Sequence, residues 1–282
     1  RRQRQMCIRD SPRLDLRCAR YWPHIKHYSF AEATRRPSTA SLPSYRATRS
    51  PAAASRLPRC PRLPPHRPRD AAQAALLLQD IAAINVLAPL VDAHKDFFAW
   101  LVEGSPFLAR LIKRYPDTLT VLSGKPPEEY LADLYTALRA DMEQVQDRDR
   151  AIATLRHARN RAALAIALAD LADLWDVETV TDYLTRLADL AVRCGLDYLL
   201  REAADDGRLK EFSRDGLVVL ALGKHGGQEL NYSSDIDFVI YYTAKALPLV
   251  DGQDARKFYI KLVQDLTCLL YTSDAADDTP CV

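Results

Sequence analysis

LVVLALGKHGGQELNYSSDIDFVIYY, residues 217–242, joins two apolar runs through a glycine-rich segment that ends on a pair of aspartates. The runs 217–222 and 238–242 have the length and the branched side chains of buried strands, so we expect neighbouring strands of one sheet. Three glycines lie between them: Gly223, Gly226 and Gly227. Glycine lets the backbone turn sharply and approach a ligand closely. The segment therefore predicts a ligand-binding turn between two strands.

The paired carboxylates belong to Asp235 and Asp237. Residues two apart on a strand point to the same face, so we expect the two carboxylates to lie side by side. Such a pair repels unless a cation lies between its members, and oxygen ligands of this kind suit Mg²⁺, which also binds substrate phosphates. We therefore predict that Asp235 and Asp237 are catalytic metal ligands. Taken alone, an Asp-x-Asp pair is more often two solvated side chains, and a Gly-Gly turn is more often only a turn.

The glycine turn also offers partners for the phosphate groups of a nucleotide. Backbone N–H groups of the turn, the lysine within it and the serines before the aspartates can all contact phosphate oxygens. The predicted nucleotide- and phosphate-binding residues are Gly223, Lys224, Gly226, Gly227, Ser233 and Ser234. A lysine in a glycine turn is also often merely exposed. For Glu229, capping of the turn and ligand contact are both open.

Gly223 and Asp235 lie twelve residues apart. This spacing resembles the signature of the DNA polymerase β-type nucleotidyltransferases, a glycine turn followed about a dozen residues later by Asp-x-Asp. The longer wording GKHGGQELNYSSDID is similar to the bacterial bifunctional glutamine synthetase adenylyltransferase/adenylyl-removing family. His225 stands where Leu or Met is more usual, and we expect the turn to tolerate it. The resemblance covers roughly residues 71–267 and is specific in 223–237.

The resemblance implies an α+β fold, in which an N-terminal helical bundle precedes an incomplete, polymerase β-like mixed sheet. NYSS at 231–234 is similar to the family's N-terminal copy, which removes AMP from glutamine synthetase by phosphorolysis to ADP. A second copy, absent here, attaches AMP from ATP. The implied cofactor is Mg²⁺, and the implied partners are glutamine synthetase, PII signal protein, ATP/ADP and phosphate, in the regulation of nitrogen assimilation.

Both ends of the chain look non-native. Residues 1–11 can be encoded by DNA whose reverse complement encodes residues 268–278, as in adapter DNA, so we exclude 1–11 and 268–282 from fold reasoning. Residues 12–69 lack periodicity and complete a Pro-rich arm, 1–69, that we expect to be disordered. The arm is either a basic segment that binds nucleic acid or an anionic surface or, as we favour, an upstream or out-of-frame translation of GC-rich DNA.

The apparent basicity of the chain comes from this arm. It holds 17 of the 39 Lys/Arg and 3 of the 37 Asp/Glu, which leaves 22 basic against 34 acidic residues. A basic nucleic-acid-binding face is therefore not expected. No stretch approaches the roughly 18 uninterrupted apolar residues that a bilayer span needs. The cysteines have neither zinc nor disulfide-framework spacing. We expect a soluble, cytoplasmic protein without a nucleic-acid or membrane partner.

Residues 70–206 are predicted to form a bundle of four or five helices, and 207–267 a partial nucleotidyltransferase domain. Ser105 and Pro106 give an N-cap and a first-turn proline. Residues 155–175 are rich in Ala and Leu on nearly all sides, which indicates a buried helix. Gly195 interrupts the next helix late, so we expect its last turn to fray or kink.

Three arginines of the buried helix, Arg156, Arg159 and Arg161, have two open interpretations. They can contact an anion, either phosphate or an acidic partner, or they can form a solvated helix face with local ion pairs. His157 on the same helix and His94 are interpreted as a surface and a packing residue, respectively.

The resemblance implies a third carboxylate on a later strand, after a helix that the apolar face of 254–267 matches. The adapter-like tail then begins, so we expect this chain to bind nucleotide and metal weakly at most and to turn over near zero. Two other functions stay open: another nucleotidyltransferase, such as a PII uridylyltransferase or an antibiotic-modifying enzyme, and a non-enzymatic helical interaction module.

Overall fold

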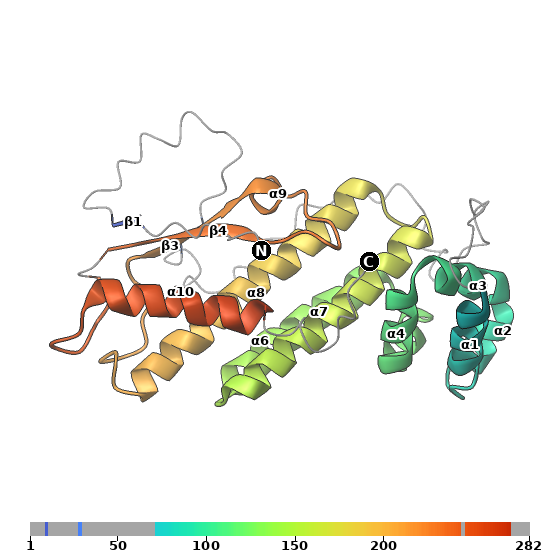
Figure 1. Cartoon of the computed structure of the whole chain (residues 1–282), viewed down its shortest axis with the longest axis horizontal. Coiled ribbons are helices and arrows are strands. Elements are labelled where there is room, and N and C mark those ends of the chain that lie inside the picture. Colours follow the sequence, from blue (N-terminus) through green and yellow to red (C-terminus); the bar gives the residue numbers. More distant parts are fainter. Residues whose placement is uncertain (1–8, 11–27, 30–70, 244–245, 272–282) are drawn as a thin grey trace. The chain divides into compact units, whose positions relative to one another are not determined.

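A computed structural model describes residues 9–10, 28–29, 71–243 and 246–271 (Figure 1). The chain divides into two compact units. We call Tyr45–Ala137 with His157–Val180 the helical unit, and Arg1–Ser44, Leu138–Arg156 and Thr181–Val282 the sheet unit. Apart from residues 9–10 and 28–29, the arm 1–69 lies outside the described residues, and so does the prediction that it is disordered.

Eight helices occupy the described residues 71–205, more than the four or five predicted. They are α1 (Ala71–Ala82), α2 (Ala88–Ala93), α3 (Lys95–Gly104), α4 (Pro106–Arg114), α5 (Pro116–Leu122), α6 (Pro127–Gln144), α7 (Arg148–Leu171) and α8 (Val177–Asp205). Prolines explain part of the difference: α4, α5 and α6 each begin with one. A proline is tolerated in the first turn of a helix but breaks its interior.

The boundary between α3 and α4 forms as the sequence predicts. Ser105 is the N-cap of α4, and its Oγ accepts a hydrogen bond from the backbone N–H of Leu108 at 3.3 Å. Leu108, Leu111 and Ile112 of α4 are buried, as is Tyr115 after it, and Pro116 then starts the next helix. A predicted helix at 155–175 was placed too late, because α7 ends at Leu171.

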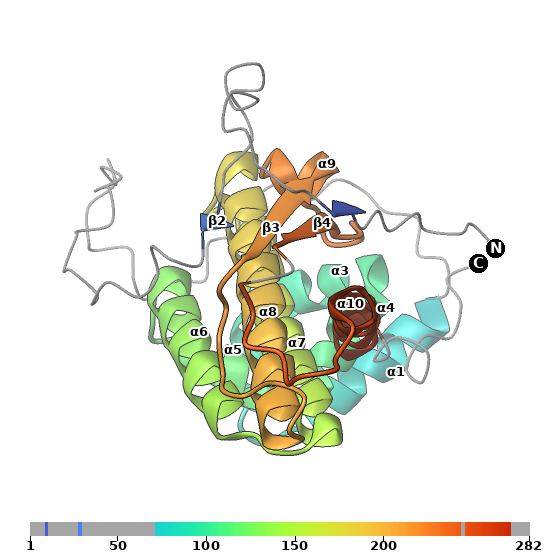
Figure 2. The same cartoon turned by 90° about the vertical axis from the view of Figure 1, so that its left-hand side faces the viewer.

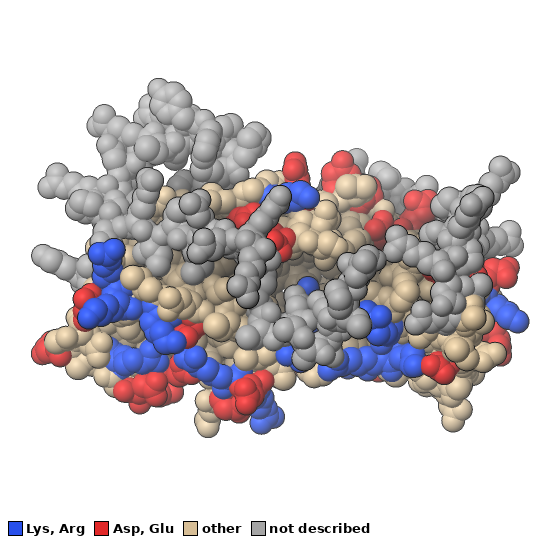
Figure 3. Space-filling model, viewed as in Figure 1, with Lys and Arg blue, Asp and Glu red and all other residues tan. Residues whose placement is uncertain are grey.

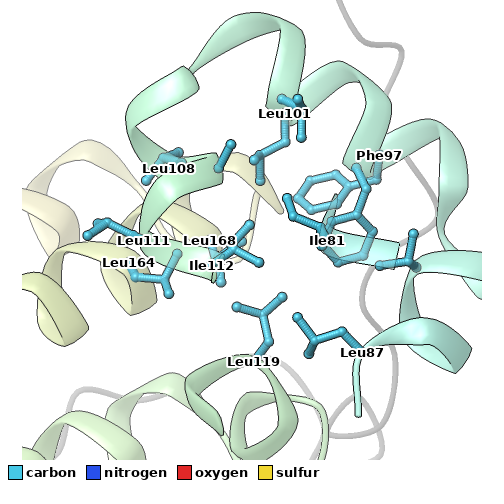
Figure 4. Close-up of a cluster of buried hydrophobic side chains, with 14 of the residues drawn as sticks. Ile81, Leu87, Phe97, Leu101, Leu108, Leu111, Ile112, Leu119, Leu164 and Leu168 are labelled. Atoms are coloured by element: carbon cyan, nitrogen blue, oxygen red, sulfur yellow. The ribbon is translucent and has the colours of Figure 1, made fainter. Parts of the chain in front are cut away.

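An apolar cluster forms the core of the helical unit. Its side chains come mainly from α1, α2, α3, α4, α5 and α7 and converge in Figure 4. The most buried members include Ile81, Phe98, Leu101, Ile112 and Leu164, each at most 1% exposed. Burying such a side chain contributes about 1.5–3 kcal/mol. The helical unit is therefore stabilised mainly by non-directional apolar burial.

The sheet unit is built on two antiparallel strands, β3 (Leu217–Leu222) and β4 (Asp237–Tyr242). Their register runs from Leu217 opposite Tyr242 to Leu222 opposite Asp237. Short strands flank them: β1 (Arg9–Asp10) pairs parallel with β4, and β2 (Tyr28–Ser29) pairs antiparallel with β3. The chain therefore has an α+β fold with a small mixed sheet.

Two helices of the sheet unit, α8 and α10 (Ala255–Tyr271), lie side by side on one face of the strands (Figure 2). Tyr259 of α10 stacks on Tyr242 of β4 at 3.7 Å between ring centroids. The predicted apolar face of α10 is buried: Phe258, Tyr259, Leu262, Val263 and Leu266. The helix continues to Tyr271, into the tail 268–282 that we excluded from fold reasoning; residues beyond Tyr271 are outside the described part.

The predicted fraying after Gly195 is wrong, because α8 continues for ten residues to Asp205. The glycine has a packing role instead. A Cβ at Gly195 would lie 2.8 Å from Cδ1 of Leu266 on α10, closer than real Cβ contacts. The absence of a side chain lets the two helices approach, which offsets the low helix propensity of glycine.

Ion pairs fix the C-terminal part of α8, at Asp197 and Glu202, within the sheet unit. Arg148 donates to both carboxylate oxygens of Glu202 at 2.7 and 2.6 Å, and to Asp265 at 3.1 Å. Arg214, just before β3, makes a two-pronged pair with Asp197 at 2.6 and 2.7 Å. On the face shown in Figure 3, basic and acidic side chains are interspersed. Among the described helices, none combines the length and apolar character of a membrane span.

Candidate functional site

The glycine turn forms where β3 ends, as the sequence predicts. Gly223–Gly226 is one helical turn, α9, which follows Leu222 directly (Figure 1). Gly223 has φ +56°, in the left-handed region that favours glycine. A Cβ at Gly226 would lie 2.5 Å from the carbonyl oxygen of Ala221. Both glycines are therefore required by the backbone, whereas a Cβ at Gly227 would meet its nearest atom at 3.4 Å.

Asp237 is the first residue of β4, opposite Leu222 at the end of β3. Its carboxylate lies against the glycine turn: a Cβ on Gly223 would come within 2.9 Å of Asp237 Oδ2. Both Asp235 and Asp237 are exposed. Ser234 before them and Ile236 between them are half-buried. The structure therefore brings the predicted glycine turn and an exposed acidic pair to the same end of the hairpin.

One detail of the acidic pair differs from the prediction. Asp235 lies in the loop before β4 and not on the strand. Its direction is consequently set by the loop and not by strand alternation. The loop is organised by Asn231, whose Oδ1 accepts from Ser234 Oγ at 2.8 Å and from the Ser233 N–H at 3.1 Å. Asn231 was not among the predicted site residues, although it stands within the NYSS motif.

Two predicted phosphate donors have partners inside the protein. The Ser234 hydroxyl donates to Asn231, and the N–H of Gly227 donates to the carbonyl of Gly223 at 3.0 Å. A contact of either group to phosphate requires exchange of these bonds. Lys224 is exposed, as a phosphate contact would need. The Glu229 N–H donates to the Lys224 carbonyl at 2.8 Å, so its backbone helps to close the turn.

His225 is buried within the turn, at 3% exposure. Its Nε2 lies 2.8 Å from Oδ1 of Asp189 on α8. The turn does more than tolerate this residue, because the imidazole has a specific polar partner. Asp189 lies 36 residues before His225, and no local sequence pattern indicated the contact.

The donor set at this end of the hairpin is suited to a hard cation. Carboxylate oxygens are the ligands that Mg²⁺ prefers, and the side-chain-free face of Gly223 leaves room beside Asp237. Among the described residues, no group of three or more His, Cys, Asp or Glu side chains could hold a metal ion. Metal binding by Asp235 and Asp237 therefore stays a prediction, in which the two carboxylates would supply only part of a coordination shell.

The arginine cluster lies apart from these residues in chain position. Arg161 donates to Asp117 at 2.5 Å and lies over the ring of Tyr115, 5.1 Å from its centroid. His157 is exposed and bonds the Tyr115 hydroxyl at 3.0 Å. Arg156 belongs to the sheet unit, whereas Arg159 and Arg161 belong to the helical unit. An anion contact by the three arginines stays a prediction.

Comparison with known proteins gives concordant results. The sequence profile of a family described as glutamate-ammonia ligase adenylyltransferase matches residues 98–277. A bifunctional glutamine synthetase adenylyltransferase/adenylyl-removing enzyme of Xanthobacter autotrophicus is 40% identical over 195 residues, 67% of this chain and 20% of the relative. Enzymes of the same name from Rhodopseudomonas palustris and Caulobacter vibrioides are 38% and 34% identical over 60% and 64% of the chain. The chain spans about a fifth of the length of these relatives.

Proposed function

Because the chain belongs to the glutamate-ammonia ligase adenylyltransferase family, we propose that its glycine turn and acidic pair form a magnesium-dependent nucleotide site acting on glutamine synthetase. The observation that carries the proposal is the contact between the turn and the acid: Asp237 Oδ2 lies against the bare face of Gly223. This contact supports the proposal, because backbone suited to binding an anion then lies beside a carboxylate suited to binding a cation. The sheet then corresponds to part of a polymerase β-like nucleotidyltransferase domain, preceded by the helices of residues 70–206.

Each group of the site has a role that its chemistry allows. Asp235 and Asp237 hold Mg²⁺, which neutralises negative charge that develops on the phosphates. The N–H groups of the turn at 223–227 and the ammonium of Lys224 contact phosphate oxygens. The bonds from Asn231 to Ser233 and Ser234 fix the loop that presents Asp235. Nucleotidyl transfer needs little covalent help from protein, so positioning and charge neutralisation are the main contributions.

The reaction we propose is phosphorolysis of adenylylated glutamine synthetase. An oxygen of orthophosphate attacks the phosphorus of the AMP group, the bond from phosphorus to the tyrosine oxygen breaks, and the tyrosine oxygen takes up a proton. The products are ADP and unmodified glutamine synthetase. The support for this direction is the NYSS stretch at 231–234. ATP-dependent adenylylation and control by a PII signal protein are proposals that rest on the resemblance.

The two carboxylates set a limit on the polypeptide of these 282 residues. We propose that it binds Mg²⁺ and nucleotide weakly and turns over near zero, because a two-carboxylate site lacks a group to orient the attacking oxygen. The profile match favours this transferase function over a PII uridylyltransferase or a helical interaction module.

The test is release of ADP from adenylylated glutamine synthetase in the presence of Mg²⁺ and phosphate. The enzyme should have the relatives' full length and carry residues 71–271 of this chain. We expect Asp237→Asn to abolish release and Asp215→Asn to leave it unchanged. Asp215 is a matched control, since it is an exposed aspartate at the opposite end of the same hairpin. Release that persists in Asp237→Asn would refute the metal-site assignment, and no release in a folded, nucleotide-binding enzyme would refute the substrate.

A further inference from the structure

We propose that Asp189 and His225 form a positioning pair that holds the phosphate-binding turn in place on α8. The inference rests on the proposed nucleotide site and adds two residues that act on it indirectly. Neither residue is proposed to contact the nucleotide or the metal.

The position of His225 within the turn is the first observation. It is the third residue of α9, between Lys224, which is exposed, and Gly226. Its neighbours in the turn are fixed to the hairpin: Gly226 packs against the Ala221 carbonyl, and Gly223 packs against Asp237. A displacement of His225 therefore moves the backbone amides and the wall that faces the Asp237 carboxylate.

The direction of the hydrogen bond follows from the chemistry of the two groups. A carboxylate can only accept, so the proton of the 2.8 Å contact belongs to Nε2 of His225. The other ring nitrogen, Nδ1, is buried and has no hydrogen-bond partner among the described residues. Asp189 therefore orients the imidazole of His225, a residue that is 3% exposed. A leucine side chain could fill a similar volume, but it could not donate a hydrogen bond to Asp189 and would therefore not be oriented by it.

The other end of the pair lies on a rigid support. Asp189 is in the middle of α8. The next residue of this helix, Leu190, is 4% exposed. Farther along the helix, Asp197 is paired with Arg214 and Glu202 with Arg148. The strand β3 begins shortly after Arg214. The turn is therefore tied to α8 directly through His225, and the start of its strand is tied to the same helix through Arg214.

The first readout follows the turn itself by amide hydrogen exchange in the full chain. The turn is closed by hydrogen bonds from the N–H groups of Gly227, Gln228 and Glu229. Loss of a hydrogen bond to a charged group raises the equilibrium constant for local opening, and with it the rate of amide exchange, about tenfold or more. We expect His225→Leu and Asp189→Ala each to speed exchange of these amides about tenfold, and the double variant to be no faster than either single one.

Two variants separate positioning from general stability. His225→Gln keeps a donor at the place of Nε2, so we expect it to restore slow exchange in the turn. Asp182→Ala is the control for Asp189→Ala, because Asp182 lies two turns earlier on α8 and pairs with Arg186. It should leave the turn unchanged. Unchanged exchange in the turn of His225→Leu, or additive effects in the double variant, would overturn the proposal.

Binding of ADP with Mg²⁺ supplies the functional readout. We expect the half-saturating ADP concentration to rise about tenfold in His225→Leu and to return close to the parent value in His225→Gln. Equal binding in the parent and His225→Leu, with faster exchange only in the variant, would overturn the link to the site. If the parent binds no ADP, the proposed nucleotide site fails, whereas the exchange data still decide whether the pair holds the turn.

Discussion

The helical unit and the glycine turn are held together by different kinds of contact. In the helical unit, many apolar side chains such as Phe98 and Ile112 share the burial, and none of their contacts depends on a fixed direction. In the turn, single atoms decide the geometry: a Cβ on Gly226 would strike a carbonyl oxygen, and one on Gly223 would crowd the Asp237 carboxylate. We therefore expect substitutions in the first region to change stability, and substitutions in the second to change nucleotide binding as well as stability.

The largest expected effect is in the core of the helical unit. Phe98 is 1% exposed, so Phe98→Ala removes a buried ring and leaves a cavity. We expect the free energy of unfolding of this unit to fall by about 3–5 kcal/mol, measured by denaturant titration. Phe107→Ala is the control, because Phe107 is 46% exposed and should change little. Equal losses in the two variants would contradict the assigned core.

A smaller effect is expected at Gly226. The added methyl of Gly226→Ala must displace the backbone at Ala221, which costs about 1–3 kcal/mol in an overpacked site. Gly227→Ala should stay within about 0.5 kcal/mol, since its Cβ has room. Denaturant titration of the sheet unit measures both. If the two alanine variants are equally stable, the close approach at Ala221 is not a constraint.

Gly223→Ala tests the contact on which the proposed site depends. An L-residue at φ +56° costs about 1–2 kcal/mol, and the new Cβ would push the Asp237 carboxylate away. We therefore expect Gly223→Ala to weaken Mg²⁺-dependent ADP binding even when the variant is fully folded. Binding is measured under conditions in which the variant is folded. Unaltered binding would show that Asp237 does not need the bare face of Gly223.

The smallest effect concerns acid stability of the sheet unit. Hydrogen bonds from Arg148 lower the pKa of Glu202, and the pKa of Asp265 is lowered by Lys261 and Arg148 although burial alone would raise it. A carboxylate with a lowered folded-state pKa stabilises the fold above its ordinary pKa, about 4 for these groups, and loses this stabilisation as pH falls. Arg148→Met should therefore flatten the decline in stability below about pH 4. An unchanged decline would exclude this network as its cause.

Regular parts of the fold could be predicted because their signals are local. The strand 217–222, the N-cap at Ser105 and the buried face of 254–267 follow from residue type and periodicity. The features that could not be predicted depend on contacts between distant residues. Gly195 packs against Leu266, and His225 bonds Asp189, so neither pair leaves a pattern in one segment.

The positions of the candidate site residues in the fold could be predicted only in part. The glycine turn was predicted from its residues and forms where β3 ends, and Asp237 is the first residue of β4. Asp235 was misplaced because the strand starts two residues after it, at Asp237. The use of the Ser234 hydroxyl by Asn231 is a side-chain choice that sequence spacing does not contain.

The most direct test of the account is the response of the backbone amide signals at 223–227 to ADP in nuclear magnetic resonance spectra of the chain. We predict that ADP with Mg²⁺ shifts these signals, that chelation of Mg²⁺ reverses the shifts, and that Asp237→Asn abolishes them while Asp215→Asn does not. Shifts that persist in Asp237→Asn, or the absence of any shift at the turn, would contradict the assignment of these residues to a metal-dependent nucleotide site.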